Sequence, residues 1–118
     1  MAAGLKALAP VLLLAGCATM SAADAEPYRA LGNEPFWSII VANGRMTYAT
    51  PEGGFSVPAP RPRETGGGRI YQTRRITLNV WHAECSDGMS DRRYAQTVRA
   101  VVDGRELRGC GGAWTGPE

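Results

Sequence analysis

Residues 35–50 read PFWSIIVANGRMTYAT, and this stretch decides the fold class of the chain. Asn43-Gly44 separates two strand-like stretches, Pro35 to Ala42 and Arg45 to Thr50. Asn-Gly is the strongest short-range signal of a β-hairpin, because both central positions of a type I′ turn need a positive φ. The sequence therefore predicts two antiparallel strands joined by a two-residue turn.

The predicted turn also sets the register of the two strands. With Asn43-Gly44 at its centre, Val41 lies opposite Met46 and Ile39 lies opposite Tyr48. One face of the hairpin then carries only large apolar side chains, which form a predicted core surface: Trp37, Ile39, Val41, Met46 and Tyr48.

Further strands are predicted along the rest of the chain. Ile76 to Val80 alternates with a period of two, and Gly68 to Thr73 is expected to add a strand before it. A last hairpin joins Tyr94–Val102 to Arg105–Cys110 through Asp103-Gly104, with Leu107 opposite Ala100. The residues expected to point inward are Ile76, Leu78, Val80, Val98, Ala100 and Val102.

The stretch from Pro51 to Gly68 holds four Pro and five Gly. We expect a long loop there, with at most a short strand at Phe55-Ser56-Val57. No helical period is visible after residue 17. The predicted fold is therefore all-β: a small antiparallel barrel or strongly curved meander of five to seven strands, since closing a sheet hides its edges.

The N-terminus predicts export. Ten apolar residues, Ala7 to Gly16, are too few to span a bilayer, which takes about 20, but they match a cleaved signal helix. Leu14-Ala15-Gly16-Cys17 resembles the lipobox of bacterial lipoproteins, in which the cysteine carries the lipid. An ordinary signal peptide cut near Ala25 is the alternative. The predicted organisation is a signal peptide over 1–16, a lipidated tether over 17–27 and a β-domain over 28–118.

Lipid at Cys17 places the protein in the cell envelope, held on a membrane through its N-terminus. In such lipoproteins an Asp after the cysteine favours retention in the inner membrane, and here Ala18 follows. The periplasmic face of the outer membrane is therefore favoured if the source has two membranes.

Once Cys17 is assigned to lipid, Cys85 and Cys110 are an even pair in an exported domain, and we expect a disulfide. The loop it closes has about 25 residues, for which the chain-entropy model gives about 3 kcal/mol. A metal site would need more ligands than Cys85 and His82 supply. His82 shares the parity of Val80, so we expect it on or beside the core face as a structural residue.

Two segments are richer in functional groups than a plain meander requires: GNEPFW at 32–37 and CSDGMSDRRY at 85–94. Together they resemble an uncharacterised family of small bacterial exported lipoproteins, over Tyr28 to Cys110. That family shares the Glu-Pro-Phe-Trp strand, the Cys-x-Asp-Gly-Met-Ser-Asp-Arg-Arg-Tyr turn and a hairpin ending in Gly-Cys. It often has Pro where this chain has Ala95. The resemblance implies the same localisation and disulfide, and it implies no activity.

These segments supply a candidate recognition surface. Arg92 and Arg93 are adjacent, so in a strand they point to opposite faces, and at most one can pair with a given carboxylate. The structural alternative is a turn locked by Asp–Arg hydrogen bonds beside the disulfide. The candidate surface residues are Glu34, Trp37, Asp87, Ser90, Asp91, Arg92, Arg93 and Tyr94.

The favoured function is a non-enzymatic envelope lipoprotein whose tethered domain binds a periplasmic protein or glycan. One alternative is a lysozyme-inhibitor-like lipoprotein acting through the loop from Ser90 to Tyr94. A second is an enzyme that modifies cell-wall material or lipid. A net charge of +2 does not indicate nucleic-acid binding, and no nucleophile-elbow, zinc-protease or phosphate-loop motif predicts a catalytic residue, metal or cofactor.

Overall fold

The computed structural model describes residues 27–89 and 91–116. The predicted signal peptide, Cys17, most of the tether and Ser90 lie outside the described residues. Within them the chain forms ten strands: β1 (Tyr28–Asn33), β2 (Phe36–Ala42), β3 (Arg45–Thr50), β4 (Gly53–Pro58), β5 (Arg63–Thr65), β6 (Gly68–Gln72), β7 (Ile76–Trp81), β8 (Cys85–Ser86), β9 (Arg93–Val102) and β10 (Arg105–Thr115).

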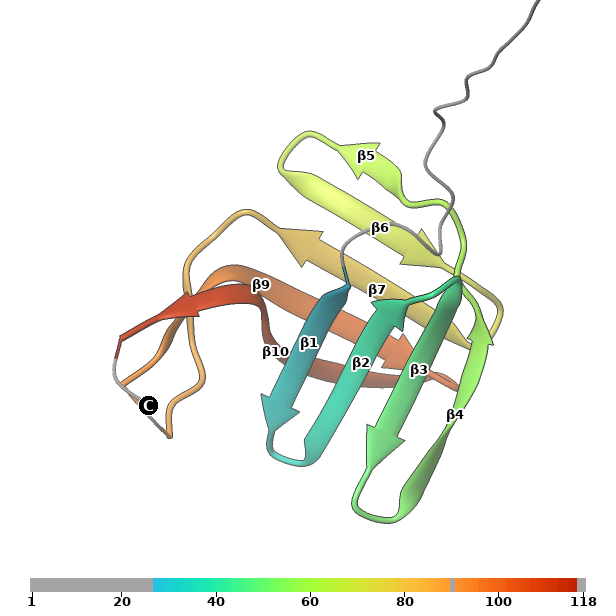
Figure 1. Cartoon of the computed structure of the whole chain (residues 1–118), viewed down its shortest axis with the longest axis horizontal. Coiled ribbons are helices and arrows are strands. Elements are labelled where there is room, and N and C mark those ends of the chain that lie inside the picture. The colour runs from blue at the N-terminus through green and yellow to red at the C-terminus, as the bar shows by residue number, and fades with distance from the viewer. Residues whose placement is uncertain (1–26, 90, 117–118) are drawn as a thin grey trace, which may run out of the picture.

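The strands form one antiparallel sheet in the order β4-β3-β2-β1-β10-β9-β7-β6-β5, with the short β8 paired to β9. The sheet curls on itself into a half-barrel, so that β1–β4 lie across from β6 and β7 (Figure 1). The guanidinium of Arg75, just before β7, lies 3.5 Å from the ring centre of Phe55 in β4, across the curl. The predicted all-β curved sheet is therefore confirmed.

Both predicted hairpins have the expected turn and register. Asn43 and Gly44 adopt φ of 54° and 76°, and Asp103 and Gly104 adopt 49° and 86°. The predicted partners are those observed: Val41 with Met46, Ile39 with Tyr48, and Leu107 with Ala100.

The core lies on the concave face of the curled sheet. Because side chains alternate along a strand, one face of each long strand is buried there. All of the side chains predicted to point inward belong to this core or pack against it. Its buried members are Ala30, Trp37, Ile39, Met46, Tyr71, Ile76, Leu78, Val80, Val98, Ala100, Val102 and Leu107.

Three expectations need correction. First, the sheet has ten strands rather than five to seven, in part because Tyr28–Asn33 forms a strand between β2 and β10. Second, the proline- and glycine-rich stretch, expected to be a long loop, supplies β4 and β5. That stretch pairs because its prolines lie at strand ends or between strands. His82 is exposed rather than on the core face, because β7 ends at Trp81 and the alternation ends with it.

No helix among the described residues has the length and apolar character needed to cross a membrane.

Candidate recognition surface at the disulfide end

One end of the half-barrel is organised by the disulfide. Cys85 in β8 is bonded to Cys110 in β10, with 5.5 Å between their Cα atoms, as predicted. Cys110 pairs with Leu31 of β1 and shares its outer face, yet it is buried, because β8 lies over it. The bond thus joins β8 to the convex side of the sheet.

The segment after Cys85 is a tight turn held by its own side chains. Asp87 Oδ1 accepts a hydrogen bond from the Met89 N–H (2.9 Å), and Ser86 Oγ accepts one from the Gly88 N–H (3.3 Å). Gly88 has φ of +78°, a left-handed conformation that favours glycine. The predicted Asp87-Gly88 turn is therefore present.

A second contact fixes this turn to the β1–β2 connection. The Asn33 side-chain N–H donates to the carbonyl oxygen of Asp87, 54 residues away in sequence. Asn33 pairs with Phe36 across the Glu34-Pro35 turn, so two separate turns are held together. An open pocket of about 340 Å³ lies between them and is lined by Asn33, Glu34, Cys85, Asp87, Arg108 and neighbouring backbone. We call the two turns, with Arg92, Arg93 and Trp114, the disulfide end.

Two of the predicted surface residues belong to the interior. Trp37 is 4% exposed and Tyr94 is 3% exposed, so neither side chain can form an exposed contact in this conformation. The Trp37 indole packs on the backbone of Gly32, where a Cβ would collide with it, and it also lies close to Gly109. This corrects the expectation that Trp37 is part of an exposed recognition surface.

The remaining predicted residues divide between exposed and partly buried positions. Glu34, Asp91 and Arg93 are exposed, whereas Asp87 and Arg92 are partly buried. The guanidinium of Arg92 lies 4.6 Å from the ring centre of Trp114 in β10, a cation–π contact. Ser90 lies outside the described residues.

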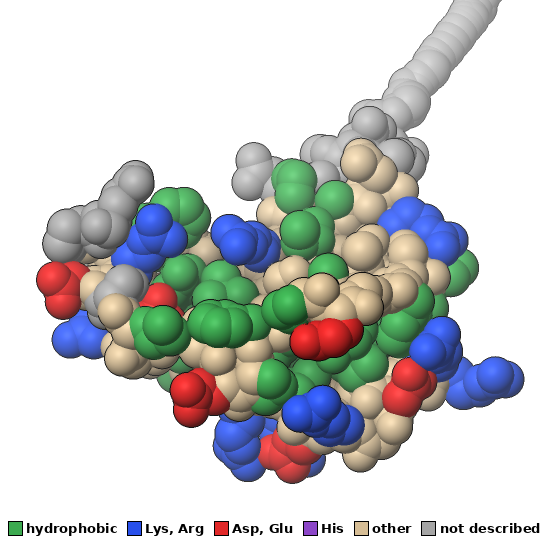
Figure 2. Space-filling view, turned by 90° about the horizontal axis from the view of Figure 1, so that it is seen from below, with side chains coloured by type: hydrophobic (Ala, Val, Ile, Leu, Met, Phe, Trp, Pro, Cys, Tyr) green, Lys and Arg blue, Asp and Glu red, His purple; other side chains and the backbone are tan. Residues whose placement is uncertain are grey.

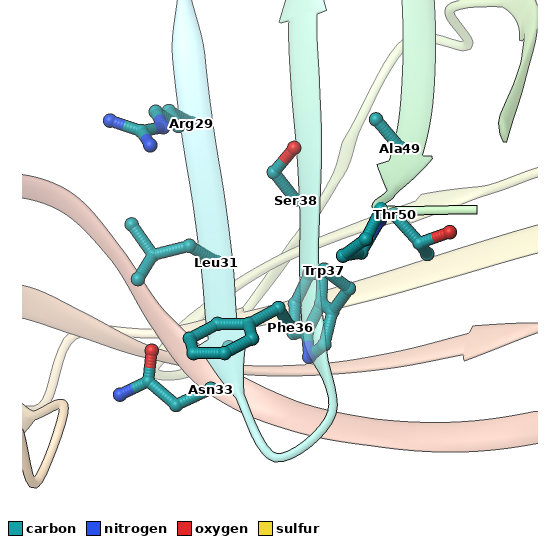
Figure 3. Close-up of a pocket in the computed structure, with 10 residues that line it drawn as sticks. Arg29, Leu31, Asn33, Phe36, Trp37, Ser38, Ala49 and Thr50 are labelled. Carbon is teal, nitrogen blue, oxygen red and sulfur yellow. The ribbon is translucent and has the colours of Figure 1, made fainter. Parts of the chain in front are cut away.

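The apolar side chains at this end were missed from the sequence. Phe36 is 54% exposed, Met89 67% and Trp114 42%, three of the five large hydrophobic side chains exposed among the described residues. Phe36 adjoins Leu31, and both line an open pocket of about 350 Å³ on the convex face of β1 and β2 (Figure 3). The parity of Phe36, opposite to that of Trp37, was the signal available in the sequence.

Charged side chains also lie beside exposed apolar ones elsewhere on the surface. Viewed from below, apolar side chains lie at the surface with Arg, Asp and Glu side chains around them (Figure 2). On β10, Glu106 accepts a hydrogen bond from Arg99 (2.8 Å) and forms an ion pair with Arg108 (2.7 Å). The hydrogen bond from Arg99 is the main cause of the lowered pKa of Glu106, so this carboxylate is ionised at neutral pH.

In residues 27–89 and 91–116, no three His, Cys, Asp or Glu side chains are grouped so as to hold a metal ion. No protein-family model, curated protein or solved structure matches this chain.

Proposed function

We propose that this protein is a non-enzymatic envelope lipoprotein whose tethered β-domain binds a periplasmic protein through the disulfide end. One observation carries the proposal: Phe36, Met89 and Trp114 are large, exposed and apolar, and all three lie at the end held by a disulfide. Exposed apolar side chains that gather at one place on a small domain are characteristic of interaction sites.

The composition of this end fits a protein partner. Aromatic residues, Met and Arg are the residue types enriched at the centre of protein–protein interfaces, and Phe36, Met89, Trp114, Arg92 and Arg93 are of these types. The disulfide and the Asn33–Asp87 hydrogen bond order both turns before binding. Less conformational entropy is then lost on association, which strengthens binding.

The anchor is the second part of the proposal. Lipid on Cys17 would hold the domain at the envelope, at the periplasmic face of the outer membrane in a cell with two membranes. Several acyl chains hold a protein on a bilayer far more firmly than one. The residues between Cys17 and Tyr28 would then set the reach of the disulfide end.

Inhibition of lysozyme through the loop from Ser90 to Tyr94 has less support. The loop residues that such an inhibitor would insert into an enzyme must be exposed, and Tyr94 is buried against the sheet, with its ring 6.2 Å from that of Trp114. A glycan partner is also less favoured, because the large exposed side chains at this end, Phe36, Met89 and Trp114, are apolar.

Capture of partners from native envelopes tests the proposal. The full-length protein, expressed in its own host with a C-terminal tag, is crosslinked, purified and compared with Phe36→Ser combined with Met89→Ser. We expect one dominant crosslinked protein with the unmodified chain, and at least a tenfold loss with the double variant, because truncated interface anchors cost about 2 kcal/mol or more.

Ile40→Ser is the matched control, since Ile40 is on the same strand and face as Phe36 and is 40% exposed. It should leave capture unchanged. Equal loss in the control, or capture that survives the double variant, contradicts the proposed surface. Mass spectrometry of the purified protein should give an N-terminus at acylated Cys17; an N-terminus at Asp24 or later contradicts the anchor.

A further inference from the structure

A second site lies at the open mouth of the half-barrel, where β1 faces β6; on β9 and β10 it adjoins Tyr94 and Trp114. It is a pocket of about 520 Å³ bounded by residues from β1, from β6 and from the β9–β10 hairpin, three parts of the chain that are distant in sequence. A volume of this size suits a small molecule, and barrel mouths are a preferred place for ligand sites. We call this the mouth pocket, and its principal residues are Tyr28, Arg29, Arg69, Tyr71, Gln96 and Gly112.

Arg69 is the central side chain of the mouth pocket. Its guanidinium lies 4.8 Å from the ring centre of Tyr28 and 5.6 Å from that of Tyr71. Its Nε donates a hydrogen bond to the Tyr71 hydroxyl at 3.0 Å, which fixes the plane of the guanidinium. The two rings thus hold the cation in place across the gap between β1 and β6.

Arg69 forms no ion pair in the described part of the chain: Glu64 is its cross-strand partner in β5, but Glu64 is exposed and does not line the pocket. The ion pairs there join other arginines to Asp103 and Glu106, and no Asp or Glu lines the mouth pocket. Arg29 adds a second cation to the lining. A partly buried guanidinium held by aromatic rings, without a carboxylate, is an arrangement that attracts an oxyanion.

The hydroxyl of Tyr28 adds a buried polar group. It packs against Gly111, where a side chain would collide with it, and it has no hydrogen-bond partner among the described residues. Burial raises the pKa of Tyr28 to about 12, so the phenol keeps its proton at neutral pH and remains a donor. Among the described residues, the lining of the mouth pocket therefore carries two arginines and no carboxylate.

We propose that the mouth pocket binds a small anionic ligand, with its phosphate or carboxylate on Arg69 and the rest of the molecule against Tyr28 and Tyr71. The planar guanidinium suits both kinds of oxyanion, because each offers two acceptor oxygens to paired N–H groups. Gly112, with φ of +83°, leaves the rim of the pocket free of side chain at β10.

Two sources of such an anion differ in their relation to the membrane. Pro27 lines the mouth pocket directly before β1, so the pocket lies where the chain enters the domain. If Cys17 is anchored as proposed, ten extended residues reach about 35 Å, which brings a phospholipid headgroup within range of the pocket. A soluble sugar acid or sugar phosphate is the other source. The oxyanion is common to both, and binding itself does not depend on the proposed anchor or partner.

Nuclear magnetic resonance of the full mature protein tests the proposal. Glycerol 3-phosphate and glucuronate are titrated against their uncharged counterparts, glycerol and glucose. We expect saturable shifts at the Arg69 Nε–H and at the amides of Gln96 and Gly112 with the anions only. No saturable shift with either anion, or equal shifts with the uncharged compounds, overturns the proposal.

Variants show whether Arg69 carries the binding. Arg69→Gln should weaken binding roughly tenfold or more, since hydrogen bonds to a charged group are worth about 1.5–3 kcal/mol. Tyr71→Phe keeps the ring and the charge but removes the acceptor of the Arg69 Nε–H, and it should weaken binding less. Arg105→Gln removes one exposed charge outside the mouth pocket and should bind as the unmodified chain does.

Circular dichroism and thermal unfolding check each variant. If Arg69→Gln does not fold, Tyr71→Phe decides: unchanged affinity in Tyr71→Phe overturns the proposal, as does unchanged affinity in a folded Arg69→Gln.

The source of the anion is read from the same Arg69 Nε–H signal in bicelles of phosphatidylcholine, with and without phosphatidylglycerol. A shift with phosphatidylglycerol supports a headgroup ligand. A shift with soluble anions alone supports a free ligand. Since these signals come from the mouth pocket, they are read separately from crosslinking at the disulfide end.

Discussion

The two ends of the β9–β10 hairpin are held in different ways. At the turn end, Arg75 donates to both carboxylate oxygens of Asp103 (2.9 and 2.7 Å) and stacks on Phe55. At the opposite end β10 is irregular between Gly111 and Trp114, and a disulfide joins it to β8. Where the strands pair regularly, a two-residue turn and buried side chains are enough to hold the hairpin together. Where the pairing becomes irregular, a covalent bond holds the chain, and large apolar side chains are exposed.

Of the changes that test this difference between the two ends, loss of the disulfide should destabilise the fold most. Cys85→Ser combined with Cys110→Ser should lower the free energy of unfolding by about 3 kcal/mol, because the unfolded chain is no longer constrained by the closed loop. Urea unfolding measures this loss. Hydrogen exchange should speed most at 85–89 and 91–94 and least in the β2–β3 hairpin. If hydrogen exchange became faster uniformly over the sheet, the disulfide would stabilise the whole sheet and not its own end alone.

A smaller effect is expected from Gly32→Ala. A Cβ at Gly32 would collide with the indole nitrogen of Trp37 and lie 2.7 Å from the carbonyl oxygen of Arg108. Overpacking of this kind costs about 1–3 kcal/mol. The control is Gly67→Ala, where a Cβ meets nothing within 4 Å. Equal unfolding midpoints for the two variants would contradict the close packing of Trp37 between β1 and β10.

The smallest effect is expected at the turn end, from Asp103→Asn. The hydrogen bonds from Arg75 lower the pKa of Asp103, so the pair stabilises the fold fully above the ordinary pKa of about 3.9. This contribution is lost as the pH falls through the lowered pKa. The difference in melting temperature between Asp103→Asn and the unmodified chain should therefore be present at pH 7 and shrink below pH 4.

Exposure and salt screening make this pair weak even at pH 7. Glu64→Gln, which removes one negative charge at an exposed position in β5, is the matched control. A difference that grows in acid would contradict the pairing of Asp103 with Arg75.

The predicted parts of the fold share one property: each rests on neighbours in the sequence. Asn43-Gly44 defines its own turn, and the register of Val41 with Met46 follows from it. Leu107 and Ala100 follow in the same way from Asp103-Gly104. β1 was not predicted, because Tyr28–Asn33 has weak alternation and the Glu34-Pro35 turn that joins it to β2 carries none of the usual hairpin signals. Its other partner, β10, lies about 80 residues away in sequence.

The candidate sites were predicted less completely. The disulfide followed from counting cysteines, and the turn at 85–89 from its Asp-Gly pair. The sequence motifs did not separate buried from exposed members: Trp37 and Tyr94 are in the interior, while Phe36 and Met89 are exposed. That division depends on where the sheet curls and where β8 lies over it, and neither is a local property.

By itself, the sequence determined the fold class, the two hairpins and their registers, since turn chemistry and side-chain alternation act over short stretches. It also determined the cysteine pairing, since two cysteines remain once Cys17 is assigned to lipid. Only the tertiary structure decided that Arg69 of β6 meets Tyr28 of β1, and that Asn33 meets Asp87. These contacts join residues roughly 40 and 54 positions apart. They exist because a twisted sheet of this size curls until its distant strands share one core.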